Sequence, residues 1–235
     1  MPAARADILV HFGAGSRAEL NSILRQANRA VLVEAGSAAF EALAAHADGH
    51  DAIDVRHVVI DALGSEERQF FVYNLAVASG LHEPEGLKAL APGLRVEKQF
   101  GVKCFGACDF LSRSIAPGET AILVLDVNGE EAAIIEALTG TAILDQIVQL
   151  RVHCGVQPLY SDALAAAEIE TLLRDAGFEQ VGMTGAGARR VVTGRKPGRS
   201  RLQKLAKWHA EQLEITKGEL EEAQSQREAI KAEAA

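Results

Sequence analysis

A short apolar run, Ile8–Val10, leads into a turn that contains two glycines, Gly13 and Gly15. Because neither glycine has a Cβ, the backbone can bend sharply there and come close to a ligand. Ser16 and Glu19 follow with the spacing of a capping box, which predicts a helix whose first amides face the turn. A strand, a glycine turn and a capped helix, in this order, are typical of a nucleotide-binding loop.

Acidic residues stand at the ends of the next two apolar runs. Glu34 follows the glycines by about 20 residues, the separation at which a carboxylate can accept hydrogen bonds from both ribose hydroxyls. The alternative is that Glu34 is an exposed acid that caps the following helix. Asp61, next to Ala62, is expected beside an adenine, where its carboxylate can accept from an exocyclic amine; a purely structural role is equally compatible with the sequence.

Two later strand ends carry groups suited to proton transfer. His153 is the first candidate for a general base, because an imidazole titrates near neutral pH. The alternative is a histidine that is only hydrogen-bonded at a strand end. Asp126 is the second candidate, as the base or as the residue that fixes the acceptor, unless it caps the helix that begins near Glu130. Asn128 completes the predicted catalytic set.

Acidic and histidine side chains of this kind are also potential metal ligands. No ligand spacing among Asp126, Glu130, Glu131 and His153 argues for a metal ion, and none is predicted.

Strand-length apolar runs alternate with segments of helical periodicity from Asp7 to Ala176. Most of the runs lack in–out alternation, which is typical of strands covered on both faces of a parallel sheet. The pattern predicts an α/β fold, a Rossmann-like doubly wound and mostly parallel sheet with right-handed crossovers. The predicted strands are Ile8–Phe12, Ala30–Glu34, Val55–Asp61, Ala121–Asp126 and Ile147–Cys154, and the predicted helices are Ala18–Ala27, Ser37–Ala47, Glu130–Leu138 and Asp162–Ala176.

Two regions break the alternation. Extended segments, Arg68–Tyr73 and Val96–Cys104, flank the loop Asn74–Arg95, which we expect to be a lid or substrate wall that sets the acceptor, or else a surface excursion. Near the end of the domain, Phe178–Met183 and Ala188–Thr193 are joined by a glycine-bearing connection, which indicates a hairpin. The parallel sheet is therefore expected to finish with an antiparallel pair.

The composition changes after Pro197-Gly198, so we predict a domain over 1–197 and a helical extension over 198–235. The extension is rich in Ala, Glu, Lys and Gln, which predicts a long helix with a thin heptad seam. A weak coiled coil and a helix laid along the domain are both compatible with this seam. The extension is thus a possible homodimer contact or partner helix through 200–235.

The composition limits the partners. With 235 residues and a net charge of −8, the chain has a full core in one domain and a charge unsuited to a sequence-independent grip on nucleic acid. Three cysteines without a metal-binding pattern indicate reduced thiols and a cytoplasmic protein. No run reaches the roughly 18 apolar residues of a membrane span, so none is expected.

Gly13, Gly15 and Ala18 fit the dinucleotide fingerprint, which suits either a nicotinamide cofactor or S-adenosylmethionine. The Ala-Gly-Phe at 176–178 and the hairpin after it resemble the reversed final strand of class I S-adenosylmethionine-dependent methyltransferases. The segment Leu123–Glu131, followed by Ile134–Leu138, is similar to the Lys-Ile-Asp-Val-Glu-Gly-Ala-Glu segment of the FkbM-type methyltransferase family. His57–Gly64 and Phe70–Tyr73 resemble the middle of that family, so the resemblance covers about 7–196.

The resemblance implies S-adenosylmethionine as cofactor and transfer of its methyl group to an oxygen of a sugar, another glycan or a small hydroxylated compound. The residues expected to bind the cofactor are His11, Phe12, Gly13, Ala14, Gly15, Glu34, Ala35, Asp61, Ala62 and Asp126.

This chain departs from the family pattern at three places. Asn128 stands where the family usually has Glu, Leu123–Leu125 lacks its Lys, and His11 replaces an acid that commonly holds the methionine amino group. A non-catalytic scaffold that acts through its C-terminal helix is therefore the alternative function, and a nicotinamide-dependent reductase ranks third.

Overall fold

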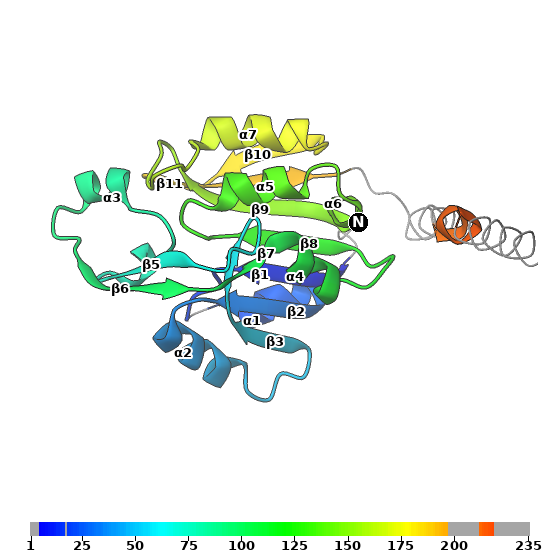
Figure 1. The fold of residues 1–235 in the computed structure, drawn as a ribbon, viewed down its shortest axis with the longest axis horizontal. Helices are drawn as coiled ribbons and strands as arrows, with labels where there is room; N and C mark the ends of the chain where they lie inside the picture. The colour runs from blue at the N-terminus through cyan, green and yellow to red at the C-terminus, as the bar shows by residue number, and fades with distance from the viewer. Residues whose placement is uncertain (1–4, 17, 197–211, 219–235) are drawn as a thin grey trace, which may run out of the picture. The chain divides into compact units, whose positions relative to one another are not determined.

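The computed structural model describes residues 5–16, 18–196 and 212–218. The chain divides into two compact units, Met1–Gly198 and Arg199–Ala235 (Figure 1). In the second unit, the described residues 212–218 are helical. The rest of the predicted extension, with its coiled coil and its dimer or partner contact, lies outside the described residues.

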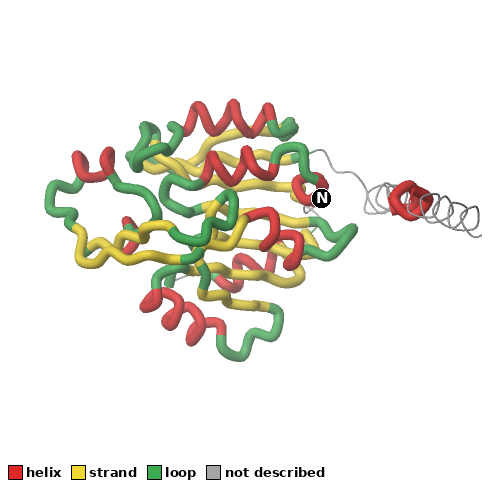
Figure 2. Tube along the Cα trace, viewed as in Figure 1, coloured by secondary structure: helices red, strands yellow, loops and turns green. Residues whose placement is uncertain are grey.

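The strands of the first unit are yellow in Figure 2. Seven of them form one sheet in the order β10-β11-β9-β8-β1-β2-β3. The five strands β9, β8, β1, β2 and β3 are mutually parallel, and β11 runs antiparallel to both β9 and β10. The mostly parallel sheet that ends in an antiparallel pair is therefore confirmed. The strands are β1 Ala6–Phe12, β2 Ala27–Glu34, β3 Ile53–His57, β8 Ala121–Leu125, β9 Ile147–Gly155, β10 Gln180–Thr184 and β11 Arg189–Arg195.

Helices cover both faces of this sheet, because alternate residues of a strand point to opposite faces. In β1, Ile8, Val10 and Phe12 enter the core beneath helices α4 to α7, whereas Leu9 enters the core beneath α1 and α2. This two-sided burial explains why the apolar runs lack alternation. The helices are α1 Leu20–Gln26, α2 Ser37–Ala47, α4 Ala107–Ser114, α5 Glu131–Leu138, α6 Ala142–Gln146 and α7 Ala166–Asp175.

Helix α1 is shorter than the predicted Ala18–Ala27, and the capping-box prediction was wrong. Its N-cap is Glu19, whose side chain makes no capping hydrogen bond in the described structure. The helix ends at Gln26 because Ala27 already belongs to β2, where it pairs with Ala6 of β1. With only seven residues, α1 offers no extended row of amides to the glycine turn.

The predicted strand Val55–Asp61 is split between two sheets. The main sheet contains β3, which ends at His57 opposite Glu34, the last residue of β2. Beyond His57 the chain has no further residue of β2 to pair with. It forms β4, Val59–Asp61, which pairs with β7, Cys104–Gly106, in a separate two-stranded sheet. Asp61 therefore does not end a strand of the main sheet, as the sequence had indicated.

The two extended segments around residues 74–95 form an antiparallel pair, β5 Arg68–Tyr73 and β6 Val96–Val102. We call residues 68–102 the arm; in Figure 1 it extends to the left of the sheet. Its connection contains a short 3₁₀ helix, η1 Ala76–Ala78, and helix α3, Glu85–Leu90. Backbone hydrogen bonds from Leu87 N to Leu159 O (3.0 Å) and from Ser161 N to Glu83 O (2.8 Å) fasten the arm to the loop after β9.

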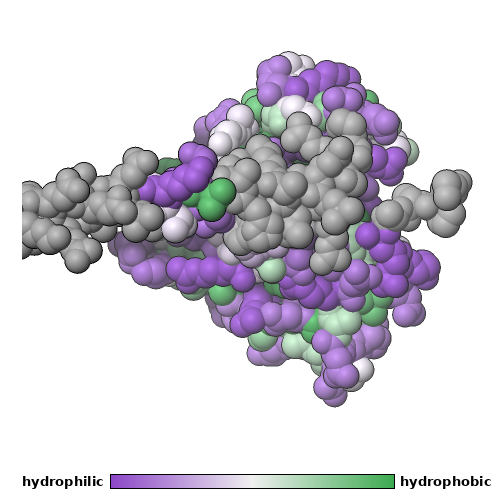
Figure 3. All heavy atoms as spheres, turned by 90° about the vertical axis from the view of Figure 1, so that its right-hand side faces the viewer, coloured by the Kyte–Doolittle hydropathy of each residue, from purple (hydrophilic) through white to green (hydrophobic). Residues whose placement is uncertain are grey.

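On the face of the molecule in Figure 3, hydrophilic side chains predominate among the described residues, and apolar ones occur singly or in small groups. Among the helices formed by described residues, none combines the length and the apolar character that crossing a membrane requires.

Candidate functional site

The glycine turn after β1 lies between the ends of β2 and β8. Gly13 N and Ala14 N donate to Val33 O, at 2.9 and 3.0 Å, and Asp126 N donates to Phe12 O at 2.9 Å. Gly13 has a φ of +79°, and a Cβ on it would lie 1.9 Å from the carbonyl oxygen of Asp126. Only glycine fits this position, so the turn and the end of β8 are packed backbone against backbone.

Glu34 holds the other side of the turn. Its Oε2 accepts from Gly15 N and its Oε1 accepts from Gly36 N, both at 2.8 Å. Each carboxylate oxygen has two lone pairs, so the half-buried Glu34 can still accept hydrogen bonds from a ligand. The structure thus brings the predicted Glu34 to the predicted glycines.

The other residues predicted near the turn contribute differently. Phe12 directs its ring into the core, edge-on to Phe110, so only its backbone faces the turn. Ala14 is buried, and Ala35 is half-buried directly after Glu34, with its carbonyl oxygen 3.2 Å from His57 Nε2.

A cluster of charged and imidazole groups lies where β1, β8, β9 and β11 meet. Arg189 donates to Asp126 Oδ1 at 2.5 Å, and His153 Nδ1 lies 3.5 Å from Asp126 Oδ2. The rings of His11 and His153 are stacked, with centroids 6.4 Å apart. Of the predicted residues, His11, Asp126 and His153 are therefore close neighbours.

The sequence analysis did not identify Arg189 as a site residue. Its position follows from the reversed strand β11, where Arg189 pairs with Gly155 and Val191 pairs with His153. The hairpin signal was visible in the sequence, but the register that brings Arg189 to Asp126 was not.

Burial lowers the pKa of both imidazoles in the cluster and so favours their neutral forms. Burial lowers the pKa of His11 to about 4, against the opposing charge of Asp126. Burial also lowers the pKa of His153, with Asp126 raising it and Arg189 lowering it further. Burial therefore favours the neutral form of His153, and this form can accept a proton.

A small hollow that opens to solvent lies beside this cluster. Its wall comes from the turn after β8, the end of β9, the segment 159–164 and Arg189. The loop Asn74–Arg95, predicted to form the substrate wall, supplies none of the described lining residues; it packs behind the wall through Leu159 and Ser161. Lining residues include Asn128, Glu131, His153, Leu159, Tyr160 and Arg189.

The turn after β8 is held by the buried carboxylate of Glu131. Its Oε1 accepts from Val127 N at 3.1 Å and its Oε2 accepts from Gly129 N at 2.8 Å. Burial raises the pKa of Glu131 to about 7, although these amide hydrogen bonds oppose the change. Glu131 thus shapes the backbone on both sides of Asn128.

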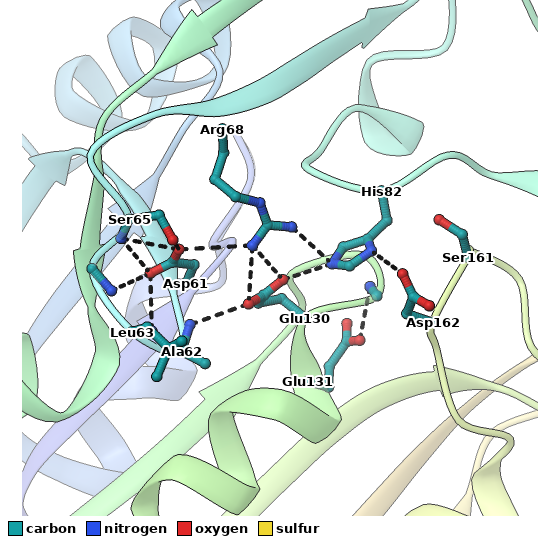
Figure 4. A network of polar contacts seen from close by, with 12 residues as sticks. Asp61, Ala62, Leu63, Ser65, Arg68, His82, Glu130, Glu131, Ser161 and Asp162 are labelled. Atoms are coloured by element: carbon teal, nitrogen blue, oxygen red, sulfur yellow. Dashed lines mark hydrogen bonds and ion pairs between the residues drawn. The ribbon is translucent and has the colours of Figure 1, made fainter.

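The carboxylate of Asp61, which was predicted to lie beside an adenine, is hydrogen-bonded within its own loop (Figure 4). Its oxygens accept from the backbone amides of Leu63, Gly64 and Ser65 and from Ser65 Oγ, and the residue is 1% exposed. Burial raises the pKa of Asp61, but these hydrogen bonds outweigh burial and hold it below its usual value. No part of this geometry supports the predicted contact with an exocyclic amine.

The neighbouring Glu130 joins three segments. Its Oε1 accepts from Ala62 N at 3.1 Å, and its Oε2 lies 3.4 Å from Arg68 Nη1 and 2.6 Å from His82 Nε2 (Figure 4). The amide of Ala62, predicted to bind cofactor, is therefore engaged inside the protein. Within the described part of the chain, no group of three or more His, Cys, Asp and Glu side chains is arranged to hold a metal ion.

No protein-family model matches the chain, and no curated protein matches it. Among solved structures, it is similar to magnesium protoporphyrin IX methyltransferase from Synechocystis PCC 6803 with bound SAM, at 11% identity and a TM-score of 0.44, covering 82% of this chain and 71% of that one. It is also similar to the METTL16 MTase domain, at 11% identity and a TM-score of 0.48 (84% and 62%). A third similar structure is an O-methyltransferase family protein from Burkholderia thailandensis, at 12% and 0.45 (83% and 52%).

The chain thus spans between about half and about seven tenths of these three proteins. All three TM-scores are below 0.5, and the strand order of this chain, rather than these matches, defines its fold.

The close approach of Gly13 to β8 predicts a difference between two glycines that share a φ of +79°. Gly49→Ala, at a position with open space around it, should lose about 1–2 kcal/mol of unfolding free energy, the cost of a left-handed backbone. Gly13→Ala should lose more, because its Cβ collides with Asp126 O. Urea unfolding measures both variants, and equal losses would show that the turn is not packed against β8.

The burial of His153 leads to a prediction about its pKa. We expect its pKa, followed by NMR of the imidazole proton, below the ordinary 6.5. Asp126→Asn removes the charge that favours the imidazolium and leaves Arg189 unpaired, so the pKa should fall further and His153 should stay neutral to lower pH. Asp54→Asn, at an exposed pair with Arg56, is the control. An unchanged or higher pKa in Asp126→Asn would contradict the contact.

Proposed function

We propose that this chain is an S-adenosylmethionine-dependent methyltransferase that methylates a hydroxyl oxygen of a small acceptor. The observation that carries the proposal is the sheet order β3-β2-β1-β8-β9-β11-β10 with β11 reversed, combined with a glycine turn after β1. The reversed final strand is the feature by which the sequence resembles class I methyltransferases. Ligands of open α/β sheets bind beyond the carboxyl ends of the strands, which is where Gly13, Glu34 and Asp126 meet.

The residues around the turn fit such a cofactor. Gly15 has open space where a Cβ would lie, which suits a ligand passing close to the backbone. The lone pairs left on Glu34 suit the two ribose hydroxyls. His11 Nε2 is buried, and no donor from the described residues reaches it, so it can accept a hydrogen bond from the methionine ammonium group. Since His11 is neutral, it should hold that ammonium less tightly than a carboxylate would.

His153 is the proposed base. When bound, the cofactor supplies a methyl group on a sulfonium, a good leaving group for displacement by oxygen. His153 would take the proton of the acceptor hydroxyl, which would leave that oxygen free to bond to the methyl carbon. Asp126 orients His153 through Nδ1 and holds Arg189, so the remaining ring nitrogen is available to the acceptor.

The FkbM-type subfamily and a sugar or other glycan as acceptor are the finer parts of the proposal. They rest on the resemblance of Leu123–Glu131 to that family's segment. The substitution of His11 for an acid favours one alternative, a methyltransferase-like scaffold without catalysis.

Binding of S-adenosylhomocysteine, measured by calorimetry, tests the proposal. Wild-type protein should bind it, and Glu34→Ala should lose on the order of 1–3 kcal/mol, because the ribose hydroxyls then lack their acceptor. Glu41→Ala, exposed on α2, is the matched control and should bind like wild type. No binding by wild type would favour the scaffold, and unchanged affinity in Glu34→Ala would remove Glu34 from the site.

A further inference from the structure

The side chain of Asn128 has one polar atom that the fold leaves unused. Asn128 is 9% exposed, and its Oδ1 is buried with no donor in reach among residues 5–16, 18–196 and 212–218. A buried acceptor without a hydrogen bond destabilises the fold. An unsatisfied buried acceptor calls for an explanation, and a ligand that donates a hydrogen bond to it would provide one.

The amide of Asn128 is fixed in orientation. Its Nδ2 donates to Val77 O at 3.0 Å and to Ser79 O at 2.9 Å, both on the arm. A flipped amide would turn its oxygen toward two carbonyl oxygens and lose both hydrogen bonds. Packing also leaves little freedom, because a Cβ on Gly80 would lie only 3.2 Å from Asn128 Cβ. The Oδ1 atom therefore cannot turn to another partner.

The backbone of Asn128 is fixed as well. The carboxylate of Glu131 accepts from the amides of the residues on either side, Val127 and Gly129. Between them Asn128 has a φ of +55°, in the left-handed region, which asparagine tolerates better than most residues. The arm, the turn after β8 and the start of α5 thus hold one acceptor atom in place.

Asn128 lies in the wall of the hollow that also contains His153 and Arg189. We propose that Asn128 Oδ1 is a specificity-determining acceptor in the substrate subsite, and that it takes a hydrogen bond from a second hydroxyl of the acceptor, one that is not methylated. This inference rests on the proposed function and names the substrate class of the same site.

The chemistry of the wall defines that class. An amide oxygen is too weak a base to remove a proton, so the hydroxyl on Asn128 stays protonated while His153 deprotonates another. Arg189 is already paired with Asp126, so it does not call for an anionic substrate. The expected acceptor is a neutral compound with at least two hydroxyl groups, such as a diol or polyol.

The test is a calorimetric titration with catechol, myo-inositol and methyl glucoside as probes, run with and without S-adenosylhomocysteine. Phenol and benzoate are the one-hydroxyl and anionic counterparts of catechol. We expect at least one of the polyhydroxyl probes to bind wild type more tightly than either counterpart. Asn128→Gly should weaken that binding at least ten-fold and leave the affinity for S-adenosylhomocysteine within two-fold.

Asn128→Gly suits a positive φ, so it keeps the turn, and its melting temperature checks the fold. Asn74→Gly is the matched control, because both polar atoms of Asn74 are bound, to Gly93 O and Arg95 N, away from the hollow. The inference is overturned if no polyhydroxyl probe binds wild type, if benzoate or phenol binds best, or if Asn128→Gly binds like wild type. If S-adenosylhomocysteine does not bind wild type, the proposed function is refuted. If a polyhydroxyl probe nevertheless binds wild type and Asn128→Gly loses that binding, the subsite is still supported.

Discussion

The approach of the Gly13 backbone to the carbonyl oxygen of Asp126 is the contact on which the rest of the site depends. A Cβ would need to lie 1.9 Å from that oxygen, so the turn closes only around glycine. The same turn is held by Val33 O and, through Gly15, by Glu34. One backbone contact therefore places the ends of three neighbouring strands, and with them a carboxylate on each side of the turn, within one small region.

Buried carboxylates order the loops around that region. Glu131 binds the amides on both sides of Asn128, and Glu130 joins Ala62, Arg68 and His82 (Figure 4). Burying such charges is costly unless each is hydrogen-bonded, and here the amides and cations supply those bonds. Glu130 and Glu131, which the sequence analysis named as potential metal ligands, are thus buried because they hold loops in place. The acids that remain near the glycine turn are Glu34 and Asp126.

The mostly parallel sheet was predictable because buried parallel strands leave continuous apolar runs in the sequence, as Leu123–Leu125 does. The hairpin was predictable because its glycines are local signals; Gly185 and Gly187 both have positive φ. The position of Glu34 beside the glycine turn was predictable from its separation from the glycines in the sequence. Each of these features depends on residues close to one another in the chain or on a simple repeat.

Features that depend on pairing between distant segments were not predictable. Asp61 lies outside the main sheet because β4 pairs with β7, a strand more than forty residues later in the chain. Arg189 reached Asp126 through the register of β11 against β9. The setting of Asn128 depends on carbonyl oxygens of the arm. No local pattern encodes these contacts. The predicted helix also begins later than Ser16, with Glu19 as its N-cap, and it ends at Gln26 because Ala27 already belongs to β2.

We propose that an S-adenosylmethionine-type ligand binds over the glycine turn, and a crystal structure grown with S-adenosylhomocysteine tests this claim most directly. We predict its ribose hydroxyls on Glu34, its backbone-facing atoms along Gly13–Gly15 and its amino group beside His11. Ligand bound away from the turn, or a ribose that faces away from Glu34, would contradict the claim.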